Sequence, residues 1–153
     1  MNTLELKVPP VVVALIAAAA MWAAARYVPA LSQALPFAGP IALVLAAAGA
    51  VIGAAGVAAF RRAGTTVSPI DVSRSTSMVT TGIFRHTRNP MYVGLLFGLL
   101  GWAVHLANLL ALALVAAFAL YLTRFQIVPE ERALSARFGG GFDAYRRSVR
   151  RWL

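Results

Sequence analysis

Two short polar segments carry the residues best suited to chemistry, and each borders a long apolar stretch. The first is residues 82–94, Gly-Ile-Phe-Arg-His-Thr-Arg-Asn-Pro-Met-Tyr-Val-Gly, and the second is the pair Glu130 and Glu131. Arginine can hold an anionic group through two hydrogen bonds, and a carboxylate can anchor a cationic amino group or accept a proton. Because polar groups at a membrane boundary are costly, this layout indicates a site rather than an ordinary surface.

Structural roles explain several of the same residues when each is taken alone. Asparagine followed by proline, as in Asn89 and Pro90, is a common way to begin a helix. Glu130 and Glu131 follow Pro129, and carboxylates are favourable at a helix N-terminus. The residue types therefore leave helix cap and functional site open at both places.

The remaining polar and aromatic candidates carry weaker signals. Tyr92, one turn into an apolar stretch, is typical of an aromatic side chain at a membrane interface. His86 and His105 are isolated, with no third ligand spaced to join them. The sequence therefore predicts no metal site.

The composition places the chain in a membrane. Its 153 residues are 60% apolar and 12% charged, with a mean hydropathy of +0.75. A soluble domain is about one quarter charged and somewhat under half apolar, so this chain has too little polar surface for water. The chain forms one domain, 1–153, and its lack of cysteine excludes disulfides, thiolate metal sites and a cysteine nucleophile.

Four membrane spans are predicted. Residues 10–28 and 36–60 are each apolar over the roughly twenty residues needed to cross the hydrocarbon core. A later stretch of 33 residues without formal charge, 91–123, is too long for one ordinary span. We interpret it as a helical hairpin with arms at about 90–105 and 108–127.

The basic residues indicate the orientation. Thirteen of the 14 lysines and arginines lie before the first span, between the second and third, or after the fourth, and only Arg26 lies on the other side. The positive-inside rule makes the richer side cytoplasmic. We therefore expect both termini and the site in the cytoplasm. The alanine- and arginine-rich composition suggests a bacterial inner membrane.

Glycines in two of the predicted spans indicate close helix packing. Gly49 and Gly53 in the second span, and Gly94 and Gly98 in the third, each follow the small-xxx-small pattern. Helices in lipid associate through close backbone contact, which such pairs permit. A phosphate-binding role is not indicated because neither pair follows a strand.

The C-terminal region predicts an amphipathic helix. Phe142, Tyr145, Val149 and Trp152 recur at three- and four-residue spacing among arginines. We expect this helix to extend to Trp152 on an anionic membrane surface, with its arginines in contact with solvent or lipid. The predicted fold is thus an all-α integral membrane bundle of about four transmembrane helices with a C-terminal cytoplasmic amphipathic helix.

Three stretches, in this order, resemble the isoprenylcysteine carboxyl methyltransferase family, including its bacterial relatives and the phospholipid methyltransferases. They are Thr-Thr-Gly-Ile-Phe-x-x-x-Arg-Asn-Pro-Met-Tyr-Val-Gly, then Glu-Glu-x-x-Leu-x-x-x-Phe-Gly after an apolar hairpin, and finally Tyr-Arg-Arg-x-Val-x-Arg-Trp. The resemblance covers about residues 64–153, and the combination is more specific than any one stretch.

The resemblance implies an integral membrane methyltransferase that uses S-adenosylmethionine. Residues 1–60 would form two N-terminal transmembrane helices, and 61–153 the cofactor-binding core. The family pocket combines the loop before the hairpin, an Arg-His-Pro-x-Tyr segment and the first glutamate of the pair. The matching residues here are Thr76, Ser77, Met78, Val79, Phe84, Asn89, Pro90, Met91, Tyr92 and Glu130.

The chain departs from the family pattern at two positions. Asn89 stands in place of a histidine, which keeps hydrogen bonding but removes a base. Gln126 stands where eukaryotic members have the arginine that meets the substrate carboxylate, and Arg124 is the expected replacement. By this resemblance Arg124 and Gln126 are expected to bind the substrate, and Arg124 and Glu131 to act in catalysis.

The expected partners are membrane lipids and a lipidic or small hydrophobic acceptor, with no nucleic acid. Isoprenylcysteine-type carboxylate O-methylation is the reaction that the resemblance implies. Phospholipid headgroup N-methylation and a non-catalytic membrane scaffold are the alternatives, and a reductase that binds NADPH has no dinucleotide signature to support it. A carboxylate acceptor needs no base, whereas an amine or thiol does, with Glu131 and His86 as candidates.

Overall fold

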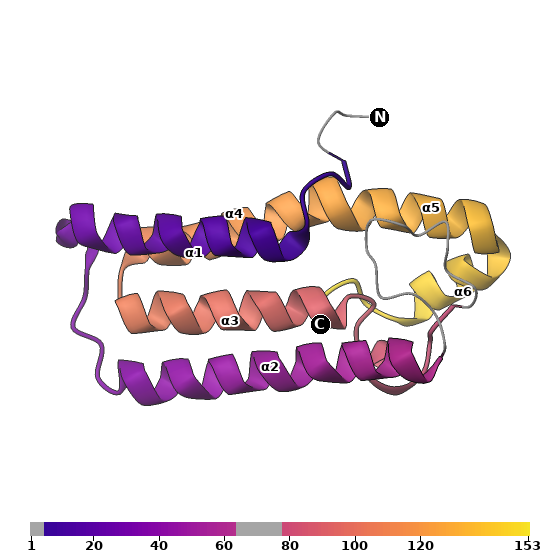
Figure 1. The fold of residues 1–153 in the computed structure, drawn as a ribbon, viewed down its shortest axis with the longest axis horizontal. Coiled ribbons are helices and arrows are strands. Elements are labelled where there is room, and N and C mark those ends of the chain that lie inside the picture. The colour runs from indigo at the N-terminus through magenta and orange to yellow at the C-terminus, as the bar shows by residue number, and fades with distance from the viewer. Residues whose placement is uncertain (1–4, 64–77) are drawn as a thin grey trace.

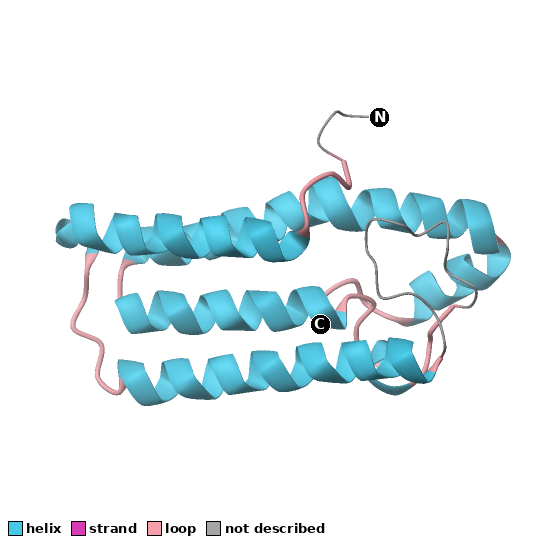
Figure 2. Ribbon diagram, viewed as in Figure 1, coloured by secondary structure: helices cyan, strands magenta, loops and turns pink. Residues whose placement is uncertain are grey.

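A computed structural model describes residues 5–63 and 78–153, which form a bundle of helices (Figure 1, Figure 2). Helix α1 covers Pro10–Tyr27, and a short 3-10 turn, η1, covers Pro29–Leu31. Helix α2 covers Ala38–Arg62. The turn η3, Gly82–Arg85, leads into the second half of the bundle.

The second half contains the hairpin and the C-terminal helices. Helix α3 covers Pro90–Leu106 and α4 covers Leu109–Leu122. A π-helical segment, η4, Thr123–Ile127, continues α4 directly into α5, Val128–Phe138. Helix α6, Gly140–Ser148, then folds back beside α5 (Figure 1).

Helix α3 lies at the centre of the bundle, between α2 on one side and α1 with α4 on the other (Figure 1). The starts of α1 and α3 and the ends of α2 and α4 lie at the same end of the bundle. The residues that gather there, called the polar end below, are 5–9, 61–63, 78–92 and 123–153. The candidate site residues that the structure describes all come from this end.

The predicted all-α membrane fold is confirmed. Among the described residues, three helical stretches are long and apolar enough to cross a membrane, namely α1, α2 and the continuous helix 109–138, and α3 is a shorter apolar helix. Large apolar side chains remain exposed around the bundle, as expected where lipid replaces water. They include Leu15, Ile16, Leu43, Val44, Val51, Leu112 and Leu120.

The predicted glycine contacts join α2 to α3. A Cβ atom added at Gly94 would lie 2.7 Å from the carbonyl oxygen of Gly49 and 3.0 Å from the amide nitrogen of Gly53. A Cβ at Gly49 would lie 2.6 Å from the carbonyl oxygen of Gly94. The two backbones therefore touch at positions that only glycine can occupy, and this contact fixes where α3 begins its course through the bundle.

The hairpin turn lies where the sequence predicted it. Asn108 is the N-cap of α4, and its side-chain oxygen accepts hydrogen bonds from the backbone N–H groups of Leu110 and Ala111. Its amide nitrogen donates to the Val28 carbonyl and to the Ser32 hydroxyl. One buried asparagine therefore ties the hairpin turn to the connection between α1 and α2.

Glu130 and Glu131, for which the sequence left a helix N-terminus and a functional site open, lie in the first turn of α5, but α5 continues η4 without a break. Proline at position 129 has no N–H group to donate to the carbonyl of Phe125, four residues earlier. The chain passes through this point in the wider π conformation, and the backbone N–H of Leu6 donates to the Phe125 oxygen at 3.1 Å. A long-range contact thus takes the place of the missing helical bond.

The C-terminal helix is shorter than predicted and packs against protein. Helix α6 ends at Ser148, and Val149 is extended, so the helix does not reach Trp152. Phe142 is buried, and Trp152 packs against the hydrophobic core while its indole N–H donates to the Thr123 hydroxyl. The apolar side chains predicted to face the membrane surface are therefore used for internal packing.

Candidate active site

The loop before α3 is anchored from both sides. Phe84 is buried and packs edge-to-face on Phe60 of α2, with ring centroids 5.1 Å apart. Its carbonyl oxygen accepts a 2.7 Å hydrogen bond from the Tyr145 hydroxyl of α6. Burial raises the pKa of Tyr145 to about 12, so the phenol stays protonated and remains a donor.

The extended C-terminal segment, residues 149–152, binds the same loop. The backbone N–H of Arg88 donates to the Arg150 carbonyl at 3.0 Å. The Arg151 carbonyl accepts hydrogen bonds from the Asn89 side-chain amide at 2.9 Å and from the Thr87 hydroxyl at 3.4 Å. Asn89 occupies the N-cap position of α3 but makes no side-chain cap bond, so its amide holds the C-terminal segment instead.

Glu131 is the centre of a largely buried ion-pair cluster. Arg151 donates to both carboxylate oxygens, at 3.1 and 2.8 Å, and Arg88 Nη1 lies 3.2 Å from Glu131 Oε1. The side chains of Glu131 and Arg88 are only 8% and 10% exposed. Hydrogen bonding to Glu131 raises the pKa of Arg151, whereas burial lowers the pKa of Arg88 and the Glu131 charge opposes that lowering only in part.

Glu130 faces a different neighbour from Glu131. The buried Tyr92 of α3 donates its hydroxyl hydrogen to Glu130 Oε1. Adjacent residues on a helix point about 100° apart, which explains why the two glutamates make separate contacts. Glu130 is thereby fixed against the first turn of α3, next to the segment predicted to bind the cofactor.

Arg88 keeps unused hydrogen-bonding capacity. Within residues 5–63 and 78–153, its buried Nε atom has no hydrogen-bond partner, and its buried Nη1 atom is in ion-pair contact with Glu131 but forms no hydrogen bond. A buried donor without an acceptor costs about 1–3 kcal/mol. The Nε–H group of Arg88 therefore remains available to a further acceptor beside Glu131.

Arg124 and Gln126 bond to the N-terminal segment, residues 5–8, rather than to the glutamate pair. Arg124 Nη1 donates to Glu5 Oε1 at 3.0 Å, and Arg132 Nη2 donates to the same oxygen at 2.9 Å. The buried amide of Gln126 donates to the Val8 carbonyl at 2.6 Å. Their predicted contact with a substrate stays a prediction.

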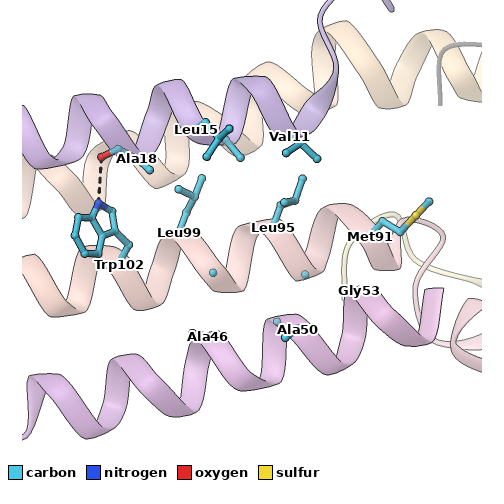
Figure 3. Close-up of a pocket in the computed structure, with 14 residues that line it drawn as sticks. Val11, Leu15, Ala18, Ala46, Ala50, Gly53, Met91, Leu95, Leu99 and Trp102 are labelled. Carbon is cyan, nitrogen blue, oxygen red and sulfur yellow. Dashed lines mark hydrogen bonds between the residues drawn. The ribbon is translucent and has the colours of Figure 1, made fainter. Parts of the chain in front are cut away.

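An apolar groove runs along α3 between α1 and α2, with a volume of about 450 Å³ (Figure 3). Val11, Gly53 and Met91 line one end, and Ala18 and Trp102 line the other. The Trp102 indole donates to the Ala18 carbonyl and joins α3 to α1 there. Met91 precedes Tyr92, so one end of the groove adjoins the polar side chains.

The structure brings together several predicted residues and adds others. Phe84, Asn89, Tyr92, Glu130 and Glu131 belong to one cluster at the polar end, with Met78 and Val79 half-buried in the preceding segment. Pro90 is the first residue of α3 and is buried, and Met91 lines the groove. Thr76 and Ser77 lie outside the described residues.

Sequence reasoning missed Thr87, Arg88, Tyr145 and Arg151 as parts of this cluster. The view that the C-terminal arginines contact only solvent or lipid is wrong for Arg151, which pairs with a buried carboxylate. Arg88 and Arg151 both lie within the family-like stretches, which was the available signal. The partner of each arginine could not be read from its own segment.

Comparisons with known proteins agree with the family resemblance. A sequence profile described as phospholipid methyltransferase matches residues 38–140, which is 103 of the 153 residues. An uncharacterized protein of Haemophilus influenzae is 44% identical over 63 residues, covering 41% of this chain and 100% of that protein. No solved structure shows a significant match. Since the profile matches more than half of its length, the chain belongs to the phospholipid methyltransferase family.

Proposed function

We propose that this protein transfers a methyl group from S-adenosylmethionine to a lipidic acceptor within the membrane. One observation carries the proposal: Tyr92 of α3 donates a hydrogen bond to Glu130 of α5 in the same first turn of α3 that supplies Met91 to the apolar groove. A polar cofactor can approach this place from water, and a hydrocarbon chain can approach it from lipid. The family supplies the reaction class, and the finer assignments below are ours.

The described residues fit the polar part of the cofactor. S-adenosylmethionine carries an amino group and a carboxylate, and we propose that the Glu130 carboxylate holds the first and the unpartnered Nε–H of Arg88 the second. Charge-assisted hydrogen bonds of this kind are the stronger ones in proteins. When bound, the cofactor supplies a methyl group already activated by its sulfonium charge.

The protein's own residues mainly orient the two reactants and shield them from water. Tyr92 fixes the Glu130 carboxylate, and Asn89 with the C-terminal segment fixes the backbone where α3 begins. Holding two reactants in line can lower a barrier by several kcal/mol without further chemistry, about 7–11 kcal/mol in the best cases. We therefore propose positioning and exclusion of water as the main contributions of this site.

A lipidic carboxylate is the acceptor class that we favour, as in isoprenylcysteine-type O-methylation. Two guanidinium groups hold Glu131, so we propose that it positions Arg88 and Arg151 instead of accepting a proton. Carboxylate methylation needs no base and suits this arrangement. The second candidate is phospholipid headgroup N-methylation, which the matched family profile favours and for which Glu130 or the exposed His86 would have to accept the proton.

The groove supports a hydrophobic acceptor. Its volume of about 450 Å³ lies within the range of roughly 300–1,000 Å³ typical of small-molecule sites. Fourteen residues line it, nearly all of them aliphatic, alanine or glycine, so it offers hydrocarbon contact along most of its length. We propose that the hydrocarbon part of the acceptor lies along α3 and that its reactive head lies near Tyr92.

Binding measurements on the detergent-purified protein test the cofactor assignment. We expect calorimetry to detect S-adenosylmethionine and S-adenosylhomocysteine but not NADPH. Glu130→Gln should weaken S-adenosylmethionine by about 1.5–3 kcal/mol, or roughly 10- to 150-fold, because a charge-assisted contact is lost. Asp143→Asn, another carboxylate change at the polar end, is the matched control and should bind as the parent does.

Methyl-transfer measurements then separate the acceptors. With radiolabelled cofactor, a farnesylated cysteine derivative should accept label and phosphatidylethanolamine should not. Label in phosphatidylethanolamine alone would favour the headgroup reaction. A folded protein that binds none of the three cofactors would instead support a non-catalytic scaffold.

We also propose that the polar end and both termini face the cytoplasm of a bacterial inner membrane. The support is the positive-inside distribution of the lysines and arginines. Since the chain has no cysteine, Ser148→Cys introduces a single thiol on the exposed side of α6. An impermeant maleimide should label it only after the cells are opened, and labelling of intact cells would reverse the orientation.

A further inference from the structure

The N-terminal segment, residues 5–8, is docked on the π-helical segment through hydrogen bonds of its own backbone groups. The backbone N–H of Leu6 donates to the Phe125 carbonyl, to which Pro129 has no N–H to donate. The side-chain amide of Gln126 donates to the Val8 carbonyl. Leu6 has a positive φ of 58°, which is an uncommon conformation for a residue other than glycine. The segment is therefore held by specific partners and not by local preference.

Glu5 is the acidic group that this docking buries. Both Arg124 and Arg132 donate to one of its oxygens, Oε1, and its side chain is only 5% exposed. The two arginine side chains are 51% and 56% exposed. Each guanidinium has five N–H donors and gives one to Glu5, so the cluster carries an excess of positive charge and of donors facing outward.

The location of these arginines suits a lipid headgroup. Arg124 lies just after the end of the apolar helix α4 at Leu122 and is the first charged residue after the 33 uncharged residues 91–123. Its guanidinium lies 5.4 Å from the centre of the Phe125 ring, which in turn packs at 4.9 Å on Tyr121. Aromatic and basic side chains together mark the interfacial layer, which also contains lipid phosphates.

We propose that Arg124 and Arg132 bind the phosphate of an anionic membrane phospholipid, and that Glu5 occupies this site as an internal competitor. Arginine grips a phosphate through two parallel hydrogen bonds, which a single carboxylate oxygen shared by two arginines does not provide. Binding of the lipid therefore displaces Glu5 and releases the N-terminal segment from Phe125 and Gln126. The site is separate from the Tyr92–Glu130 pair and does not depend on methyl transfer.

A spin label on the N-terminal segment reports the displacement directly. Lys7 is exposed, and Lys7→Cys gives one labelling position in a chain without other cysteines. In nanodiscs of phosphatidylcholine the label should be largely immobilised, and in nanodiscs of phosphatidylglycerol it should shift to a mobile spectrum. Glu5→Gln in the same background should be mobile in both lipids.

Two further measurements test whether Arg124 and Arg132, and a membrane lipid rather than free phosphate, cause the change in label mobility. The double change Arg124→Gln with Arg132→Gln should remove the difference between the two lipids, whereas Arg61→Gln, an exposed arginine at the end of α2, should retain it. Inorganic phosphate added to phosphatidylcholine nanodiscs should not mobilise the label. A label that stays immobilised in phosphatidylglycerol would overturn the proposal, as would mobilisation by free phosphate or loss of the lipid difference in Arg61→Gln.

Discussion

The N-terminal and C-terminal segments both dock on the continuous helix 109–138 through arginine–glutamate pairs. The glutamates, Glu5 and Glu131, are similarly buried, but the exposure of their arginine partners differs. At the C-terminal segment, Glu131 and Arg88 are about nine-tenths buried, and Arg151 adds a two-pronged contact. At the N-terminal segment, the two arginines that hold Glu5 are each about half exposed. An arginine–glutamate pair can thus be a stable structural contact at the C-terminal segment and an exchangeable contact at the N-terminal segment.

Burial of the arginines should determine how much stability is lost when a glutamate is removed, because a buried charge cannot be hydrated and an exposed charge can. A buried ion pair gains little net energy when it forms, but removing one partner leaves a charge that water cannot reach. A half-exposed arginine that loses its glutamate is simply hydrated or meets another anion. We therefore expect the C-terminal cluster to be intolerant of change and the N-terminal cluster to be tolerant.

The largest effect should come from Glu131→Gln. The change leaves the buried Arg88 and its neighbour Arg151 without their counter-charge, which should lower the free energy of unfolding by about 3–5 kcal/mol. Denaturant titration in detergent, followed by tryptophan fluorescence, measures this. Should Glu131→Gln prove no more destabilising than Glu5→Gln, the contrast between the two segments would be lost.

A smaller effect should come from Gly94→Ala, which tests whether the site depends on helix packing as well as on the two segments. The added methyl group would lie 2.7 Å from the Gly49 oxygen, so α2 and α3 must move apart. Overpacking of this kind costs about 1–3 kcal/mol. Gly98→Ala is the matched control on the same helix, since nothing lies within 4 Å of its new Cβ.

If the helix contact positions Tyr92 and Asn89, Gly94→Ala should also weaken cofactor binding, and Gly98→Ala should not. Equal stability of the two variants would contradict the glycine contact. Destabilisation without any change in cofactor affinity would show that the loop and the C-terminal segment alone position the site.

Asn89→Ala should have a more modest effect, because it removes one hydrogen bond from the C-terminal segment and leaves the ion pairs. The loss of the 2.9 Å bond to the Arg151 carbonyl should cost about 0.5–1.5 kcal/mol of stability. Spin labels in the C-terminal segment should become more mobile, while those in the N-terminal segment should not. Mobility that rises equally in both would mean that the two ends are coupled.

The comparison also explains what the sequence could and could not predict. Local signals were sufficient for the helices, for the turn at Asn108 and for close packing at the glycine pairs, because each depends on spacing within one apolar segment, whereas the contact of Gly49 with Gly94 comes from the structure. Pro129 with two glutamates looked like a helix start, and only the docking of Leu6 on Phe125 shows why the helix continues. Likewise, Arg151 looked like a surface charge because its partner Glu131 lies 20 residues away.

The residues proposed to bind the cofactor were predicted only in part. Their identities came from a resemblance in short stretches, and the structure adds a reason for two of them by joining Tyr92 to Glu130. No local pattern distinguished Glu130 from Glu131, since both follow the same proline. The distinction depends on which helix face meets α3 and which meets the C-terminal segment.

The smallest effect should be that of Glu5→Gln in neutral detergent, and its pH dependence identifies the pair. The Arg124 and Arg132 guanidiniums hold the pKa of Glu5 below its ordinary value of 4.5. A carboxyl whose pKa is lowered by folding stabilises the protein fully above its unfolded pKa and loses that contribution as the pH falls through its folded pKa. The stability difference between the parent and Glu5→Gln should therefore be constant above about pH 4.5 and shrink in more acidic solution.

Unfolding titrations of both proteins at a series of pH values measure this difference directly. High salt should reduce it as well, because the arginines are half exposed and the attraction is screened. The Glu131 cluster, which is shielded from water, should respond much less to salt. If the stability difference between the parent and Glu5→Gln did not change with pH or salt, Glu5 would act through its packing. The two ends of the chain would then differ in more than the burial of their charges.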